Sequence, residues 1–310
     1  MSRKMSFTAR CLWIACRGVA LMPRVIQYHC IGSVIYFIMR YILRYRRSLI
    51  LKQLTDSFPE RSKTEIRSIC NDYYHTLAET VVGTMTLASM NRRMRREVLK
   101  VEVPDSVRET LEGKNFVYFS SHHNFWEYAQ FAGLCFPGHM TVCAYHPLKS
   151  KVWDELYYHL RENADCKPVP SSELIRYFLR HKDSGIDNRR LLLGLIADQN
   201  SPPKGEVHWY NFLNHKTLFF EGGEQMALKF KMPVLYLSMS RIKAGRYRGE
   251  VKMLYDGEQS VEKHEIMERY VSELEKDIRR EPSRWMWSHR RWKYKPDPDT
   301  GEVIYCGKGY

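Results

Sequence analysis

Apolar runs alternate with amphipathic segments from residue 116 to residue 280. Consecutive apolar positions are typical of strands buried on both faces, and apolar residues every three to four positions are typical of helices that cover such a sheet. Strands are expected at residues 116–119, 140–145, 191–197, 233–239 and 247–255. Helices are expected from residue 125 and at residues 152–161, 174–179, 218–230 and 261–280. This alternation predicts an α/β fold with a central, mostly parallel sheet flanked by helices.

The first hundred residues have a different pattern. Residues 46–100 are helical in pattern with a break at residues 57–60, and Ser62 is the expected N-cap of the helix that follows. Between residue 100 and the C-terminus, the sequence shows no further clear domain boundary. We therefore expect a membrane-proximal helical region over residues 1–100 and an α/β domain over residues 101–310.

A stretch of fifteen residues without a charge, 25–39, lies between Arg24 and Arg40. A membrane-spanning helix needs about twenty apolar residues. This segment could span a bilayer only if Arg24, Arg40 and Arg44 extended to the interfaces. An amphipathic helix lying in the interface fits at least as well, so both arrangements stay open.

Charge is concentrated at the two ends of the chain. The 310 residues carry a formal net charge of +14, with 49 Lys and Arg against 35 Asp and Glu. Residues 1–55 contain ten of the cations and no acid, and residues 278–295 contain seven cations and one acid. The rest of the chain, with 32 cations and 34 acids, is slightly acidic. This distribution argues against a basic cleft through the fold and suits ends that face an anionic surface.

The amino-acid composition narrows the class of protein further. A hydrophobic share of 44% and a charged share of 27% exclude a disordered or low-complexity chain. The 8 cysteines are scattered without a CxxC pair, which gives little support to a structural zinc site or a disulfide scaffold.

The strongest candidate chemistry follows the first expected strand, in the sequence SSHHNFWE. Reactive groups of open α/β sheets gather beyond the carboxyl ends of strands. His122 in the turn and Glu127 in an early helical turn can meet, so that Glu127 accepts a hydrogen bond from one ring nitrogen. The other ring nitrogen then becomes a better general base. The alternative is a structural histidine beside a solvated glutamate.

Several blocks of the chain resemble, in order, the bacterial lipid A biosynthesis acyltransferases, the lauroyl and myristoyl transferase family. SSHHNFWE is similar to that family's S-G-H-x-x-N-W-E block. The other matching blocks are Ser57–Glu60, Tyr145–Ser150, Leu160–Glu162, Ile196–Asn200, Phe212–Asn214 with Thr217, Gly222–Gly223, and Pro282 to Lys293 with its W-x-W-x-H-R-R-W-K pattern. Departures from the family pattern are His123, His146, and Asn214 with His215.

The resemblance implies a membrane-associated acyltransferase of the bacterial inner membrane with its site facing the cytoplasm. It implies that His122 is the base acting on a lipid hydroxyl and that Glu127 orients it, so that no serine nucleophile is required. A Ser-His-Asp triad stays open, although no G-x-S-x-G motif is present. No metal or redox cofactor is implied. The expected donor is an acyl carrier protein thioester, and the expected acceptor is a lipid A precursor. The expected substrate-binding residues are Arg161, Asp198, Gln199, Asn200, Gly222, Gly223 and Arg241.

Two other interpretations remain open. The acceptor could be another glycolipid, a phospholipid or an aminolipid. A nucleic-acid-binding protein is the alternative from another class, because the C-terminal WMWSHRRWKYK interleaves aromatic residues with cations. The same segment also suits a membrane interface or a packed core with exposed arginines. The basic cluster at residues 92–96 is a plausible docking site for an acidic carrier protein.

Overall fold

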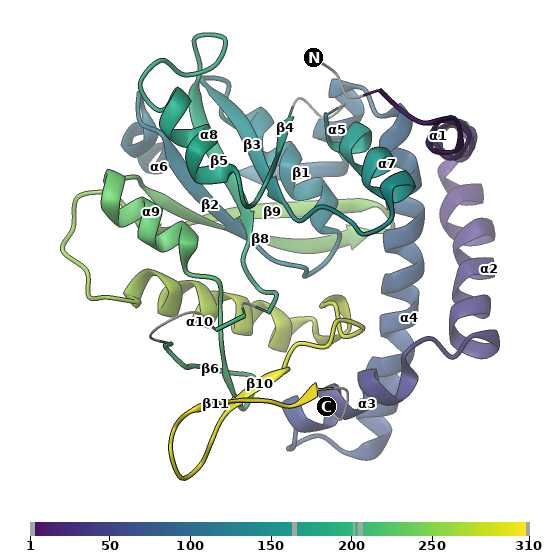
Figure 1. Cartoon of the computed structure of the whole chain (residues 1–310). Helices are drawn as coiled ribbons and strands as arrows, with labels where there is room; N and C mark the ends of the chain where they lie inside the picture. The colour runs from purple at the N-terminus through teal and green to yellow at the C-terminus, as the bar shows by residue number, and fades with distance from the viewer. Residues whose placement is uncertain (1–3, 163–165, 201, 204–206, 308–310) are drawn as a thin grey trace.

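The computed structural model describes residues 4–162, 166–200, 202–203 and 207–307. A seven-stranded sheet in the order β1-β9-β8-β2-β5-β3-β4 forms its centre (Figure 1). Its strands are β1 (Leu99–Glu102), β2 (Phe116–Ser120), β3 (His139–Tyr145), β4 (Cys166–Pro170), β5 (Arg190–Ile196), β8 (Val234–Lys243) and β9 (Arg246–Tyr255). Pairing is parallel except between β8 and β9. The predicted mostly parallel α/β fold is confirmed.

Helices cover both faces of this sheet (Figure 1). They are α3 (Arg47–Ser57), α4 (Lys63–Thr86), α5 (Arg92–Val98), α6 (Asp105–Leu111), α7 (Lys151–Glu162), α8 (Leu174–His181), α9 (Gly222–Phe230) and α10 (Glu265–Arg280), with short 3-10 turns η3 (Leu87–Ser89) and η5 (Pro282–Arg284). Small hairpins are formed by β6 (Tyr210–Phe212) with β7 (His215–Thr217) and by β10 (Tyr294–Pro296) with β11 (Val303–Tyr305).

Alternate residues of the central strands enter two separate cores. Val117 and Phe119 of β2 pack with α3, α4, α9 and α10, whereas Phe116 and Tyr118 pack with α5, α6 and α7. All four side chains are buried. Successive strand residues point to opposite faces, so a strand that is apolar at every position requires a cover on both sides.

Helix α4 connects the N-terminal segment with the sheet. Ser62 caps it as predicted: its hydroxyl accepts the N–H of Glu65, and the Glu65 carboxylate accepts the N–H of Ser62. This reciprocal capping box satisfies two of the free donors at the helix start. Along its length α4 packs against α3 and against the N-terminal helices α1 (Phe7–Leu21) and α2 (Gly32–Phe37). The proposed division of the chain at residue 100 stays a prediction.

The N-terminal segment turns a sharp corner after α1. It continues through the π-helical segments η1 (Ile26–Ile31) and η2 (Ile38–Ile42), which flank α2. Within the described residues, no single helix is long and apolar enough to cross a bilayer. Phe7–Leu21 and Ile26–Ile42 reach that length and composition only as a pair, which is bent by 118° at its break.

Three predicted helices differ from the structure. The segment expected as a helix from residue 125 is the 3-10 helix η4 (Trp126–Cys135), α9 begins at Gly222 rather than at residue 218, and α10 begins at Glu265 rather than at residue 261. Strands β1, β4, β6, β7, β10 and β11 were not predicted. They are only three to five residues long, and such short segments show little periodicity of their own.

Candidate active site

His122 lies in the turn after β2, and Asp198 lies in the turn after the neighbouring parallel strand β5. The register pairs Ser120 with Ile196, so His122 and Asp198 are each two residues beyond a matched pair. Asp198 Oδ1 accepts a hydrogen bond from His122 Nδ1 at 2.7 Å, and Asp198 Oδ2 accepts the backbone N–H of His122 at 2.8 Å. Asp198 therefore fixes both the backbone and the ring of His122.

The Nε2 atom of His122 has a different partner. The side-chain amide of Gln199 lies 3.0 Å from it. Because an ionised Asp198 can only accept, Nδ1 carries the proton and Nε2 carries the lone pair that accepts the Gln199 N–H. This is the tautomer that a general base requires.

Asp198 is buried, with 2% of its surface exposed. Burial alone would raise its pKa, but the charge of His122 and the hydrogen bonds from the His122 ring, Trp285 and the His122 backbone outweigh it and lower the pKa below the ordinary value. Trp285 Nε1 donates to Asp198 Oδ2 at 2.7 Å. Asp198 is therefore a stable anion beneath the imidazole.

The predicted hydrogen bond between Glu127 and His122 is wrong. Both ring nitrogens of His122 are engaged by Asp198 and Gln199, and Glu127 binds Arg161 of α7 instead. Arg161 Nε and Nη2 donate to the two Glu127 oxygens at 3.0 and 2.6 Å. The chain turns away after His122 because Asn124 has a φ of 60°. This conformation is tolerated by asparagine and redirects the backbone into η4.

The Glu127–Arg161 pair is mostly buried, with 5% and 21% of the two side chains exposed. Burial would lower the pKa of Arg161, but the charge and hydrogen bonds of Glu127 raise it, so the guanidinium stays charged. Its plane also lies over the ring of Tyr157, at 5.4 Å. Arg161 is thus held in one orientation by Glu127 and Tyr157.

The C-terminal tryptophans belong to the core. Trp285, Trp287 and Trp292 are at most 3% exposed, and each indole N–H has a partner, respectively Asp198, the Pro282 carbonyl and Thr217. This confirms core packing and excludes these three rings from a membrane interface or a base-stacking surface. One cation of the segment is buried as well: Arg291, at 2% exposure, donates to the Leu218 carbonyl and to Asn200 Oδ1.

His289 extends the polar cluster. Its Nε2 lies 3.1 Å from Asn200 Nδ2, which also donates to the Arg290 carbonyl. Burial, and then the charges of Arg291 and His122, lower the pKa of His289 to about 4. His289 is therefore neutral at pH 7 and adds no positive charge beside His122.

An apolar cavity of about 520 Å³ adjoins this cluster. Trp126, whose ring centre is 5.0 Å from that of His122, and His289 line it on the side of the site. The remaining walls come from α1, α4, α7 and the segment around Met286. Its volume lies within the usual range of small-molecule sites, about 300–1,000 Å³. His122 and Asp198 do not themselves line this cavity, nor another of about 520 Å³ between α7, β4 and α8.

The family profile described as bacterial lipid A biosynthesis acyltransferase matches residues 3–294. The chain belongs to this family. Among curated proteins none gives a significant match. The match covers the His122 turn, the Asp198 turn and the C-terminal tryptophan segment together, so the geometry above is that of a lipid A biosynthesis acyltransferase.

The glycine pair of this acyltransferase serves packing. A Cβ on Gly223 would lie 2.5 Å from the ring of Phe119 and 2.7 Å from Leu195, both in the core. A Cβ on Gly222 would lie 2.6 Å from the ring of Phe220. The close approach at Gly223 therefore brings α9 against the sheet, whereas Gly222 approaches only the half-exposed ring of Phe220. Substrate binding by the pair stays a prediction.

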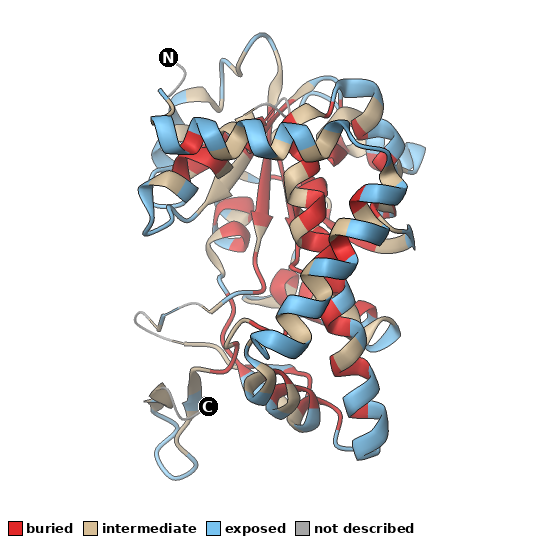
Figure 2. Ribbon diagram, turned by 90° about the vertical axis from the view of Figure 1, so that its right-hand side faces the viewer, coloured by how far each residue is buried: buried red, intermediate tan, exposed pale blue. Residues whose placement is uncertain are grey.

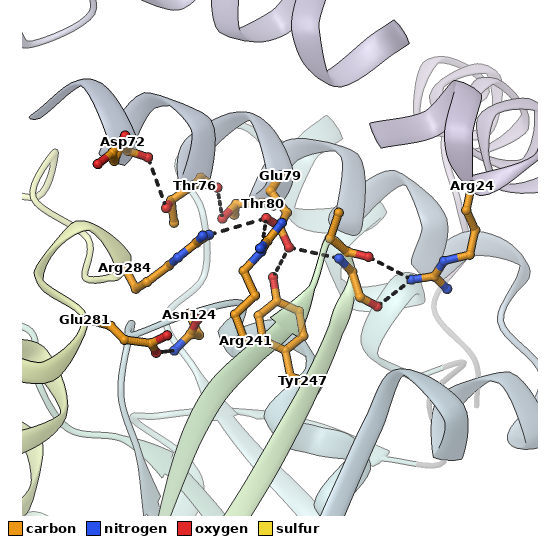
Figure 3. A network of polar contacts seen from close by, with 12 residues as sticks. Arg24, Asp72, Thr76, Glu79, Thr80, Asn124, Arg241, Tyr247, Glu281 and Arg284 are labelled. Atoms are coloured by element: carbon orange, nitrogen blue, oxygen red, sulfur yellow. Dashed lines mark hydrogen bonds and ion pairs between the residues drawn. The ribbon is translucent and has the colours of Figure 1, made fainter. Parts of the chain in front are cut away.

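Arg241 has an internal partner. Its Nε donates to Glu79 Oε2 at 2.8 Å, and Arg284 Nη1 lies 3.3 Å from the same oxygen (Figure 3). Glu79 Oε1 accepts from Tyr247 and from the Gly245 N–H. Glu79 thus neutralises much of the charge that phosphate binding by Arg241 would use, and that role stays a prediction.

Sequence reasoning missed the partner of His122, the hydrogen bond from Trp285 to Asp198 and the burial of Arg291. The available signal was that Asp198 and His122 each follow a strand that is apolar at every position. Adjacent strands of this kind bring their carboxyl ends together, but adjacency itself is not written in the sequence. Among the described residues, no group of three or more His, Cys, Asp or Glu side chains could hold a metal ion.

Proposed function

We propose that this protein transfers a fatty acyl chain from an acyl carrier protein thioester to a hydroxyl of a lipid A precursor, with His122 as the general base. The observation that carries the proposal is the imidazole held between Asp198 and the Gln199 amide, beside an apolar cavity. Family membership supports the acyl transfer and the lipid acceptor.

The chemistry needs one base and no covalent enzyme intermediate. The acceptor hydroxyl takes the place of Gln199 Nε2 and gives its proton to His122 Nε2. Its oxygen attacks the thioester carbonyl, a C–O bond forms and the C–S bond breaks. The departing thiolate then receives the proton from His122, so the enzyme returns to its first state. Asp198 stabilises the imidazolium that exists between the two transfers.

Gln199 marks the position that the acceptor oxygen takes. Its amide N–H is the donor placed nearest the reacting nitrogen, at 3.0 Å. Once displaced by the hydroxyl, this amide is free to donate to the thioester oxygen as negative charge develops there. Asn200 is held by His289 and the Arg290 carbonyl, and we assign it to positioning of this turn.

Glu127 acts through Arg161 in this proposal. The carboxylate holds Nε and Nη2 of the guanidinium, which leaves Nη1 outside this ion pair. Guanidinium geometry suits a phosphate or a developing oxyanion. Glu127 is therefore a positioning residue for Arg161 in this proposal. We expect both residues to be needed for full activity.

The apolar cavity is proposed to take the acyl chain. Its lining combines Leu12, Val19, Leu77, Val81, Met85, Trp126, Leu156 and Met286. Apolar walls favour a hydrocarbon chain by about 25 cal/mol for each Å² removed from water. The depth of such a cavity limits chain length, because a longer chain leaves methylenes exposed or strains the walls.

Membrane association at the cytoplasmic face of the bacterial inner membrane completes the proposal. It is supported by exposed apolar side chains on α1 and α2, such as Phe7, Leu21 and Phe37 at 83%, 75% and 55%, and by ten cations without an acid in residues 1–55. Apolar residues mixed with cations favour an interface that carries anionic headgroups.

The test is transfer in vitro by the full chain with a panel of acyl carrier protein thioesters and acyl-CoA, each offered to a lipid A precursor and to a phosphoglycerolipid. We expect transfer from the carrier protein to the lipid A precursor. His122→Ala should lower kcat by at least about a thousandfold, since the base and its tautomer are both removed. His181→Ala, at the end of α8, is the matched control and should keep full activity.

Specific outcomes would overturn parts of the proposal. Full activity of His122→Ala would remove the mechanism. Transfer only to the phosphoglycerolipid would replace the acceptor by another lipid. Transfer from acyl-CoA alone would replace the donor and leave the role of His122 intact.

A further inference from the structure

The corner between α1 and η1 is held by hydrogen bonds from a buried side chain. Gln27, at 4% exposure, donates from Nε2 to the carbonyls of Val19, Ala20 and Met22 at 2.8–3.1 Å. These carbonyls lie at the C-terminal end of α1 and its cap, where the helix leaves acceptors unsatisfied, and the Val19 carbonyl also accepts the Met22 N–H. The bend is therefore a fixed feature of the fold.

The same corner is bound to a hairpin more than two hundred residues away in sequence. Arg24 Nη2 donates to the carbonyls of Ala244 and Gly245, in the turn between β8 and β9, at 3.2 and 2.7 Å (Figure 3). Gly245 has a φ of 62°, and a Cβ there would clash with the Tyr28 hydroxyl. The close contact between corner and hairpin thus depends on a glycine at this position.

Ile242, near the tip of this hairpin, has an exposed side chain. The register changes between Arg241, which pairs with Tyr247, and Lys243, which pairs with Arg246. Ile242 is the extra residue of this β-bulge, and 55% of its surface is exposed. A bulge redirects a side chain away from the regular alternation of the strand.

Apolar side chains of the corner are exposed next to it. Leu21, Met22, Val25 and Ile26 are 75%, 42%, 66% and 40% exposed. We call these four residues and Ile242 the corner surface. Figure 2 views the molecule from the side of α1 and α2, and their outer faces are largely exposed.

Charge around the corner surface is mostly positive. The hairpin segment 241–248 contains Arg241, Lys243, Arg246 and Arg248 and no acid, and residues 1–55 contain no acid either. Glu79 neutralises Arg241, and exposed Arg248 lies 3.5 Å from Glu102 of β1, whereas Lys243 is exposed beside Ile242. An apolar patch bordered by cations matches a bilayer with anionic headgroups.

We propose that the corner surface inserts into an anionic lipid bilayer, with the β8–β9 hairpin as a second membrane contact beside the N-terminal helices. This inference rests on the proposed membrane association and adds a contact from the α/β core. Because Arg24 joins corner and hairpin, the two contacts enter the bilayer as one rigid unit. The site of His122 is thereby held at a fixed orientation to the membrane.

The experiment measures binding of the full chain to phosphatidylcholine vesicles with and without phosphatidylglycerol, by flotation. Ile242→Glu should lower the partition coefficient about tenfold, since it replaces a buried apolar contact by a charge facing anionic lipid. Ile242→Trp should raise it, because tryptophan favours the interface. Its added fluorescence should be quenched by brominated lipids.

Ile175→Glu is the matched control. Ile175 is 48% exposed on α8, which lies on the opposite side of the molecule from α1 and α2 (Figure 1). We expect this variant to bind vesicles as the wild type does. Circular dichroism and thermal unfolding of all three variants establish that they are folded.

The outcomes separate this inference from the proposed function. If the wild type binds vesicles and both Ile242 variants bind equally well, the hairpin contact is refuted and membrane association stands. If the wild type binds no vesicles, the hairpin contact and the proposed membrane association are both refuted. If Ile242→Glu instead dissociates a dimer without changing vesicle binding, the surface is an interface between copies of this chain and the inference is refuted.

Discussion

Asp198 controls the tautomer of His122 at the level of single atoms. Its Oδ2 accepts two fixed N–H groups, from the His122 backbone and from Trp285, and its Oδ1 accepts from the ring. If Asp198 is replaced by asparagine, the amide oxygen must face the two fixed donors, the His122 backbone N–H and Trp285 Nε1. Its NH2 group then faces His122 Nδ1, which has to become an acceptor, and the proton moves to Nε2.

Asp198→Asn is therefore expected to lower kcat by about 10²–10⁴ with little change in KM, because the wrong tautomer removes the base without removing the pocket. Steady-state kinetics with the lipid acceptor measure this, and Asp198→Glu should recover part of the activity. A merely structural role would instead appear as a lower Tm, with normal kcat in the fraction that remains folded.

Glu224 shows a different effect of burial. It is 2% exposed and its Oε2 has no hydrogen-bond partner among the described residues. Burial raises its pKa from 4.5 to about 7. Since the folded-state pKa lies above the unfolded value, proton binding stabilises the fold, and stability falls as the pH rises from about 4.5 to about 7.

Glu224→Gln should consequently raise Tm by about 2–5 °C at pH 8 and by less at pH 5. Thermal unfolding at the two pH values checks this. An equal gain at both, or a loss at pH 8, would show that ionisation of Glu224 does not oppose folding.

At the level of elements, Glu79 joins α4 to the β8–β9 hairpin and to η5. Its two oxygens have four partners, Arg241, Arg284, Tyr247 and the Gly245 N–H (Figure 3). Only 9% of the Glu79 side chain is exposed, so its loss leaves charges and donors without partners in a region with little water.

Glu79→Ala is expected to lower the free energy of unfolding by about 3 kcal/mol, as removal of one partner from a buried ion pair does. Urea denaturation measures the change. Glu97→Ala is the matched control, because its pair with Arg93 is exposed, and it should cost less than about 0.5 kcal/mol. Equal effects would mean that the Glu79 network adds no stability of its own.

At the level of the whole molecule, the apolar cavity exists only because distant segments meet. α1, α4, α7 and the segment near Met286 each contribute part of the wall.

Val81→Trp fills part of this space from α4, so we expect the preferred acyl donor to become shorter by several methylenes. Mass spectrometry of the products from a mixture of thioesters checks this. Ile14→Trp, on the exposed face of α1, should keep the wild-type preference; a shift in both variants would place the chain elsewhere.

Local patterns were sufficient for most of the fold. The five predicted strands are present, since segments that are apolar at every position are stable only inside a covered sheet. The N-cap at Ser62 and the His122 turn after β2 were likewise evident, because each depends on residues close in sequence. Short strands such as β4 and β6 were not evident from the sequence, because pairing with a neighbouring strand stabilises them rather than their own pattern.

The sequence by itself determined where β2 and β5 end and which polar groups follow these two strands. Only the tertiary structure decided that His122 pairs with Asp198 and that Glu127 pairs with Arg161. It also decided that the C-terminal tryptophans lie in the core and that Arg24 binds the β8–β9 turn. The physical reason is that strand order and helix packing bring together residues tens to hundreds of positions apart, and no local pattern records such contacts.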